Sequence, residues 1–134
     1  MSTGLEIIVR LLLAATLGAI IGYQRERHGK AAGLRTNLLI SVGSALFTLT
    51  SIYGFGITSD PSRVAAGIVT GVGFLGAGAI IRRAGGQEVG GLTTAATIWA
   101  VAAIGLTAGA GLYLLSVVAA ALILVVLLLP HPIR

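Results

Sequence analysis

The stretch from Arg63 to Arg83, RVAAGIVTGVGFLGAGAIIRR, most constrains what this chain can fold into. It is apolar between basic ends and is rich in glycine, which costs a helix in water about 1 kcal/mol per residue relative to alanine. In a lipid bilayer the same small residues let neighbouring helices approach closely. The stretch therefore predicts a membrane-spanning helix, and we expect this helix to be the packing hub of the protein.

The composition supports a membrane environment. Of the 134 residues, 56% are hydrophobic and 10% are charged, whereas a soluble domain carries about 25% charged residues. The net charge of +5 could indicate nucleic acid binding in a soluble protein, but here the basic residues cluster at the ends of apolar runs. At those positions they indicate topology and contact with lipid headgroups. We expect the lipid bilayer as a partner and no nucleic acid.

Apolar runs of helix length divide the chain at residues 5–22, 34–53, 62–81, 92–106 and 112–129. We expect an all-α integral membrane fold, a single domain over residues 1–134 built as a bundle of about five transmembrane helices. The loops on one side hold Arg25, Arg27, Lys30, Arg35, Arg82, Arg83 and Arg134, against Arg10 and Arg63 on the other side. The positive-inside rule then predicts an outer N-terminus and a cytoplasmic C-terminus.

Short matches suggest an internal repeat of two helices. The sequence GAII occurs at 18–21 and again at 78–81, and GLRT at 33–36 corresponds to GLTT at 91–94. The first two spans would then correspond to the third and fourth, with a symmetry axis along the membrane normal. Chance is the alternative, because the matches are short and the residue alphabet of these spans is small.

Small and aromatic residues inside the spans are candidates for helix packing. Gly18 and Gly22 form a GxxxG pair, and the third span places glycines on two opposite faces. Trp99 lies well inside the fourth span, which favours packing against another helix over an interfacial position. The candidate packing residues are Gly18, Gly22, Gly67, Gly71, Phe74, Gly76, Gly78 and Trp99.

The second span carries a polar stripe, made up of Asn37, Ser41, Ser44, Thr48 and Ser51. Their alternating spacing of four and three places them on one face of a helix. Because unpaired polar groups facing lipid are costly, this face should point into the bundle. The side chains either bond to helix carbonyls and help packing or line a hydrated groove.

No residue pattern indicates an enzyme. The sequence has no HExxH motif, no carboxylate pair inside a span and no cluster with metal-ligand spacing, so we expect no cofactor and no metal site. A GxGxxG match at 71–76 lies in the middle of an apolar run without a preceding strand, which argues against dinucleotide binding.

The basic loops are the remaining candidates for a functional surface. Their candidate residues are Arg25, Glu26, Lys30, Arg35, Thr36, Arg82, Arg83, Thr93 and Thr94. These residues either set the topology and contact anionic lipid or form a docking surface. Within the first loop, Glu26 is a candidate to form an ion pair with Arg25 and Arg35. At the outer interface we single out Asp60, as a helix cap or a functional acid, and Arg63.

The residues also resemble a known family. The run 25–37 is similar to the RE…K…AGLRT segment of the MgtC/SapB family. Asp60 followed by RVAA at 63–66, GVGFLGAG at 71–78 and GLTTAATIW at 91–99 resemble its other signatures, in the same order. Four ordered motifs over most of the chain make the resemblance specific.

The resemblance implies a bacterial inner-membrane protein of about five spans. Members are associated with adaptation to low magnesium and survival inside macrophages, and they are thought to bind other membrane proteins, including the F-type ATP synthase. Gly67, Gly90 and Thr93 depart from residues that members often carry, and we expect no soluble C-terminal domain after the fifth span. These departures speak against a virulence role and leave the membrane fold as the expectation.

Two functions are therefore in view. The first is a non-enzymatic regulatory or accessory protein, linked by resemblance to magnesium limitation and ion homeostasis, that contacts other membrane proteins and forms a homo-oligomer. The alternative is a homo-oligomeric transporter or channel for an ion or small solute, with the polar stripe as its lining.

Overall fold

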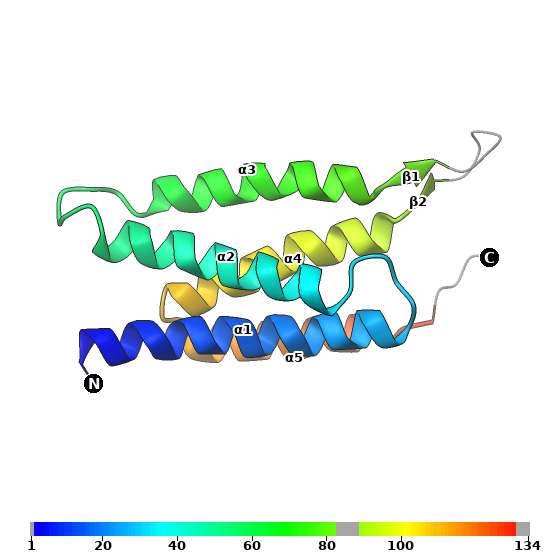
Figure 1. Cartoon of the computed structure of the whole chain (residues 1–134), viewed down its shortest axis with the longest axis horizontal. Helices are drawn as coiled ribbons and strands as arrows, with labels where there is room; N and C mark the ends of the chain where they lie inside the picture. The colour runs from blue at the N-terminus through cyan, green and yellow to red at the C-terminus, as the bar shows by residue number, and fades with distance from the viewer. Residues whose placement is uncertain (1, 83–88, 131–134) are drawn as a thin grey trace.

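The described residues form five helices, as predicted. The computed structural model describes residues 2–82 and 89–130 (Figure 1). Its helices are α1 (Thr3–Arg27), α2 (Leu34–Tyr53), α3 (Ser62–Ala79), α4 (Leu92–Gly109) and α5 (Tyr113–Leu127). Two strands of two residues each, β1 (Ile81–Arg82) and β2 (Val89–Gly90), pair antiparallel between α3 and α4.

Four of the helices, α1 to α4, are long and apolar enough to cross a membrane. The fifth, α5, is an apolar helix of 15 residues, or about 23 Å. Successive helices run in opposite directions, so the start of α1 and the end of α5 lie at opposite ends of the bundle (Figure 1). The arrangement is that of a multi-pass membrane protein.

Two helices extend beyond their predicted ends. α1 continues through Arg27, because the residues after Gly22 include good helix formers, and it gives way to a turn in which Gly29 adopts a positive φ of 68°. α4 continues to Gly109, and the following turn contains Gly111 with φ 86°. The segment 107–109, expected to be a turn, is therefore helical.

The packing hub is α4, which corrects the expectation that the glycine-rich third span is central. α4 contacts each of the other four helices, whereas α3 packs mainly on α4 and lies at the edge of the bundle (Figure 1). Only Ile68 and Gly76 of α3 are buried. The physical reason is that α4 presents small or β-branched residues on several faces, so neighbours can pack on more than one side.

The apolar core lies between α1, α4 and α5. Leu17 and Ile21 of α1 pack with Val101 and Ile104 of α4 and with Ala120 of α5. This cluster holds α1 and α4 in place, and α2 then lies against both of them.

Candidate functional site

The polar stripe of α2 points into the bundle and bonds to the neighbouring helices. All five of its side chains are buried. The hydroxyl of Ser41 donates to the carbonyl of Ala14 on α1, and that of Ser44 donates to the carbonyl of Ala102 on α4, each at 2.7 Å. These two bonds join α2 to the helices on either side of it.

The other stripe residues also donate to backbone carbonyls. Thr48 bonds within its own helix, to Ser44 at 2.8 Å, and Ser51 reaches the carbonyl of Pro61 at 3.4 Å. The amide of Asn37 donates to two carbonyls in the turn before α2, at 3.0 and 2.9 Å, while its Oδ1 is buried with no partner among the described residues. The stripe thus acts as a set of backbone-bonded contacts.

Glycines allow α2 to approach both neighbours closely. A Cβ added to Gly18 of α1 would lie 2.6 Å from Ser41 Cβ, and one added to Gly22 would lie 2.8 Å from Leu34 Cα. On the other side, a Cβ on Gly105 would overlap the carbonyl oxygen of Ser41, and one on Gly109 would lie 2.9 Å from the carbonyl oxygen of Ala45. Each GxxxG pair therefore meets α2 at backbone distance.

The pair Gly105 and Gly109 was not among the predicted packing residues. Its GxxxG spacing is the same signal that identified Gly18 and Gly22. It was missed because the fourth span was expected to end at 106, so that Gly109 fell in a predicted turn.

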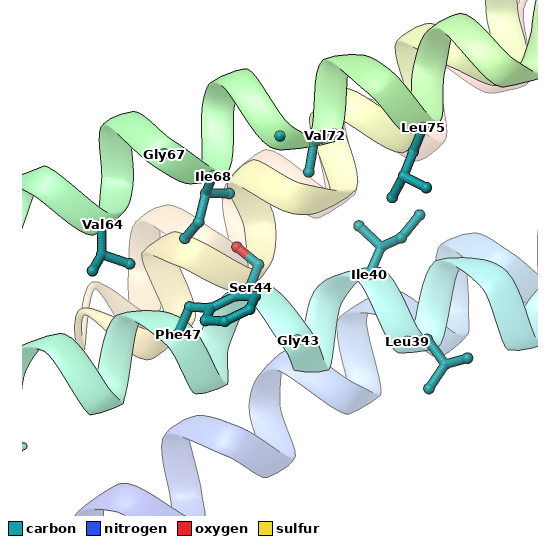
Figure 2. A pocket seen from close by; sticks show the side chains of 11 residues that line it. Leu39, Ile40, Gly43, Ser44, Phe47, Val64, Gly67, Ile68, Val72 and Leu75 are labelled. Carbon is teal, nitrogen blue, oxygen red and sulfur yellow. The ribbon is translucent and has the colours of Figure 1, made fainter.

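A groove runs between α2 and α3 (Figure 2). Its volume is about 630 Å³. Figure 2 shows Ile40 of α2 and Val72 and Leu75 of α3 pointing toward one another across it. The lining is Leu39, Ile40, Gly43, Ser44, Phe47, Val64, Gly67, Ile68, Gly71, Val72 and Leu75, which is apolar apart from Ser44.

The glycines that line this groove are uncovered. A Cβ on Gly43, Gly67 or Gly71 would meet nothing within 4 Å, in contrast to the glycines that face α2 from α1 and α4. Gly78 is equally open, and Gly76 alone among the predicted α3 glycines faces another helix, with Ala95 of α4 at 3.6 Å.

Two aromatic packing candidates point away from the bundle. Phe74 is 78% exposed and Trp99 is 59% exposed. Both were expected to pack on another helix, and the structure instead leaves most of each side chain uncovered. Trp99 lies on the outer face of α4, whereas Ile98 just before it and Val101 two residues after it are buried. In a bilayer these rings would face lipid or another protein.

The structure separates the predicted surface residues into a buried pair and an exposed set. Arg25 is buried in the last turn of α1, and its Nη2 donates to Oγ1 of the buried Thr94 at 2.8 Å. Arg82 lies in β1, and Arg83 lies outside the described residues. The exposed members are Glu26, Lys30, Arg35, Thr36 and Thr93.

Glu26 does not form the predicted ion pair with an arginine. Its carboxylate instead accepts a hydrogen bond from the backbone N–H of Leu34 at 3.1 Å, at the start of α2. A negative charge at a helix N-terminus is favourable because it satisfies a free N–H and complements the helix dipole. The ion pair in the described part of the chain joins Arg10 and Glu6 on α1, and Arg10 also donates to the carbonyl of Gly109 at 3.1 Å.

The outer interface residues lie at the start of α3. Asp60 accepts hydrogen bonds from the backbone N–H of Ser62 at 3.0 Å and from the Ser62 hydroxyl at 2.8 Å. These bonds lower the pKa of the Asp60 carboxyl from its ordinary value. Asp60 therefore helps to begin α3, although the helix itself begins at Ser62, and Arg63 is exposed in its first turn.

Within the described ranges, no three His, Cys, Asp or Glu residues are grouped as metal ligands.

Comparisons with known proteins agree on one family. A family model described as the MgtC family matches residues 11–134. The "Putative magnesium transporter YhiD" of Escherichia coli K12 is 50% identical over 133 residues, which cover 94% of this chain and 61% of the relative. Protein SrpB of Synechococcus elongatus is 48% identical over 120 residues, covering 81% of this chain and 66% of the relative.

A third relative is protein MgtC of Salmonella typhimurium LT2, 50% identical over 106 residues, covering 78% of this chain and 43% of the relative. The chain thus spans between about two-fifths and two-thirds of the length of these curated relatives. No solved structure matches the chain.

Proposed function

Because the chain belongs to the MgtC family, we propose that it is a non-enzymatic regulatory or accessory protein that acts by contacting other membrane proteins. It resides in the bacterial inner membrane, with its N-terminus outside and its C-terminus in the cytoplasm. Its role is connected with magnesium limitation, as the family resemblance implies, and the printed name of the Escherichia coli K12 relative also refers to magnesium. The resemblance makes the F-type ATP synthase the first partner to test, and the protein also forms a homo-oligomer.

The uncovered groove between α2 and α3 is the observation that carries this proposal. The GxxxG pairs of α1 and α4 meet α2 at contact distance. Gly67 and Gly71 have the same spacing, yet nothing in the described chain lies within 4 Å of a Cβ at either position. A transmembrane helix of another protein has the shape and the apolar surface to pack there. The proposal is that this groove is the contact surface.

A homo-oligomeric transporter or channel is the second candidate, favoured by the printed name of the Escherichia coli relative. Such a protein needs a hydrated path, and the polar stripe of α2 was the expected lining. The hydroxyls of Ser41 and Ser44 are instead engaged with carbonyls of α1 and α4, and the helices meet there at backbone distance. This arrangement favours the first candidate over the second.

Capture of a partner from detergent-solubilised membranes tests the groove. Gly71→Leu places a large side chain in the groove, whereas Gly73→Leu adds the same side chain to the same helix at a position that does not line it. Both positions have open space for a Cβ, so both variants should fold. We expect Gly71→Leu to lose co-purified ATP synthase or homo-oligomer and Gly73→Leu to retain it. Equal capture by the two variants would contradict a role for the groove.

Ion flux in proteoliposomes distinguishes the second candidate. The regulatory proposal predicts no protein-dependent magnesium or monovalent cation flux under any gradient. A protein-dependent flux would overturn the proposal, and a reduced flux in Ser41→Ala, which removes the hydroxyl without adding volume at the contact with Gly18, would support a path along the stripe.

A further inference from the structure

Arg25 is a buried cation without a counter-charge among the described residues. It is 4% exposed, and its one side-chain hydrogen bond runs from Nη2 to Thr94 Oγ1. Its Nε is buried with no partner, and no carboxylate in the described ranges lies within ion-pair distance. Among the described residues, a neutral hydroxyl accepts from one of the five guanidinium donors and no negative charge compensates the cation, which is costly away from water.

The guanidinium bonds to a side chain in the first turn of α4. Thr94 is the third residue of α4, and the N-cap of that helix, Gly91, has φ 86° and supplies no side-chain cap. The first backbone bond of the helix runs from the N–H of Ala95 to the carbonyl of Gly91. The preceding N–H groups carry the positive pole of the helix dipole. A cation and a helix N-terminus are therefore brought together, an arrangement that an anion would stabilise.

The start of α2 shows how this chain satisfies the corresponding turn. The sequence GLRT at 33–36 opens α2, and GLTT at 91–94 opens α4. At α2 the carboxylate of Glu26 accepts the N–H of Leu34. At α4 the side chain that reaches the first turn from α1 is the cation Arg25. The chain thus supplies its own anion to one turn and an anion-binding group to the other.

We propose that the first turn of α4 and the guanidinium of Arg25 together bind a phosphate group. Backbone N–H groups at a helix N-terminus and an arginine fork are a recognised combination for this chemistry. Leu92 and Thr93 are exposed, so a phosphate can approach the turn from the surface while Arg25 lies beneath it. The start of α4 and the end of α1 lie at the same end of the bundle (Figure 1). A phosphate group at the end of a membrane-spanning bundle belongs to an anionic phospholipid or to free phosphate.

This site is separate from the α2–α3 groove, and the inference does not depend on the proposed partner contacts. Binding to the wild-type protein is measured in two arms. In lipid-depleted detergent, the thermal midpoint is followed against inorganic phosphate at constant ionic strength set with chloride. In the second arm, the protein is taken from nanodiscs of phosphatidylcholine, either alone or mixed with phosphatidylglycerol, and the lipid that the protein retains is counted. A phosphate-dependent rise identifies free phosphate as the source, and retention of phosphatidylglycerol alone identifies lipid.

Arg25→Gln tests the residue, and Arg27→Gln is the matched control. Arg27 lies in the same helical turn, and its Nη1 donates to the hydroxyl of Tyr23, on the exposed side of α1. Because hydrogen bonds to an ionised group are the strong ones, we expect Arg25→Gln to weaken binding by about tenfold or more and Arg27→Gln to leave it within about twofold. Arg25→Lys should fall between them, since it keeps the charge and loses the fork.

The proposal is overturned if the wild-type protein responds in neither arm, whether or not the variants fold. Equal losses in Arg25→Gln and Arg27→Gln also overturn it, because the effect would then be general charge attraction. Glu88, in the loop outside the described residues, provides the last check. If Glu88→Gln destabilises the protein as Arg25→Gln does and phosphate has no effect on either, the counter-charge is internal and the proposal is wrong.

Discussion

Replacing Gly105 by alanine tests whether α2 is held at backbone distance between α1 and α4. A Cβ at this position would overlap the carbonyl oxygen of Ser41 and lie 2.9 Å from Ser44 Cβ. Overpacking of a close contact costs about 1–3 kcal/mol, and the upper end applies because a backbone atom must move. Alanine recovers about 1 kcal/mol of helix propensity. We therefore expect the free energy of unfolding to fall by about 2 kcal/mol.

Gly71→Ala is the control, because a Cβ there meets nothing within 4 Å. The same propensity gain then acts alone, and we expect unchanged or slightly increased stability. Reversible unfolding in mixed micelles, followed by the fluorescence of Trp99, the only tryptophan, compares the two variants. Equal stability of the two variants, or a larger loss in Gly71→Ala, would refute the close packing of α2 on Gly105.

Three further experiments have expected outcomes. Ser44→Ala should lower the free energy of unfolding by about 1 kcal/mol, because its hydrogen bond to α4 is lost. Ser51→Ala should lower the free energy of unfolding by less, because its hydrogen bond is 3.4 Å long. The same unfolding titration compares the two variants. Arg10→Met alone should destabilise the protein more than Arg10→Met combined with Glu6→Gln, because the single change leaves the Glu6 carboxylate unpaired. A double-mutant cycle of unfolding free energies measures the difference. Asp60→Asn should speed hydrogen exchange in the first turn of α3. Because native hydrogen bonds lower the pKa of Asp60, its contribution is fully present above the ordinary pKa of an aspartate. The contribution is lost as the pH falls through the lowered native pKa, and the variant should lack this pH dependence.

The sequence was a good guide to the number and type of elements, because apolar runs of helix length leave few alternatives in a membrane protein. The direction of the α2 polar stripe also followed from its spacing and from the cost of polar groups in lipid. Helix ends were less predictable. Tyr23–Arg27 extends α1, because polar residues at the edge of a membrane can continue a helix as readily as form a loop.

Partner choice among helices could not be derived from the sequence. Glycine spacing identifies a surface that permits close approach, but it does not say whether a helix of the same chain occupies it. Gly18 and Gly105 face α2 closely, whereas Gly67 and Gly71 have the same GxxxG spacing and stay uncovered. Likewise, basic residues near Arg25 indicated a surface, and only the fold shows that Arg25 itself is buried on Thr94.

Photocrosslinking in native membranes tests the central claim, that the groove between α2 and α3 is a contact surface. A photoreactive residue replaces Phe47, which lines the groove, or Leu122 on α5; both side chains are 63% exposed. We predict a protein adduct from position 47 that Gly71→Leu abolishes, and no protein adduct from position 122. Adducts of equal yield from both positions, or none from position 47, would contradict the claim.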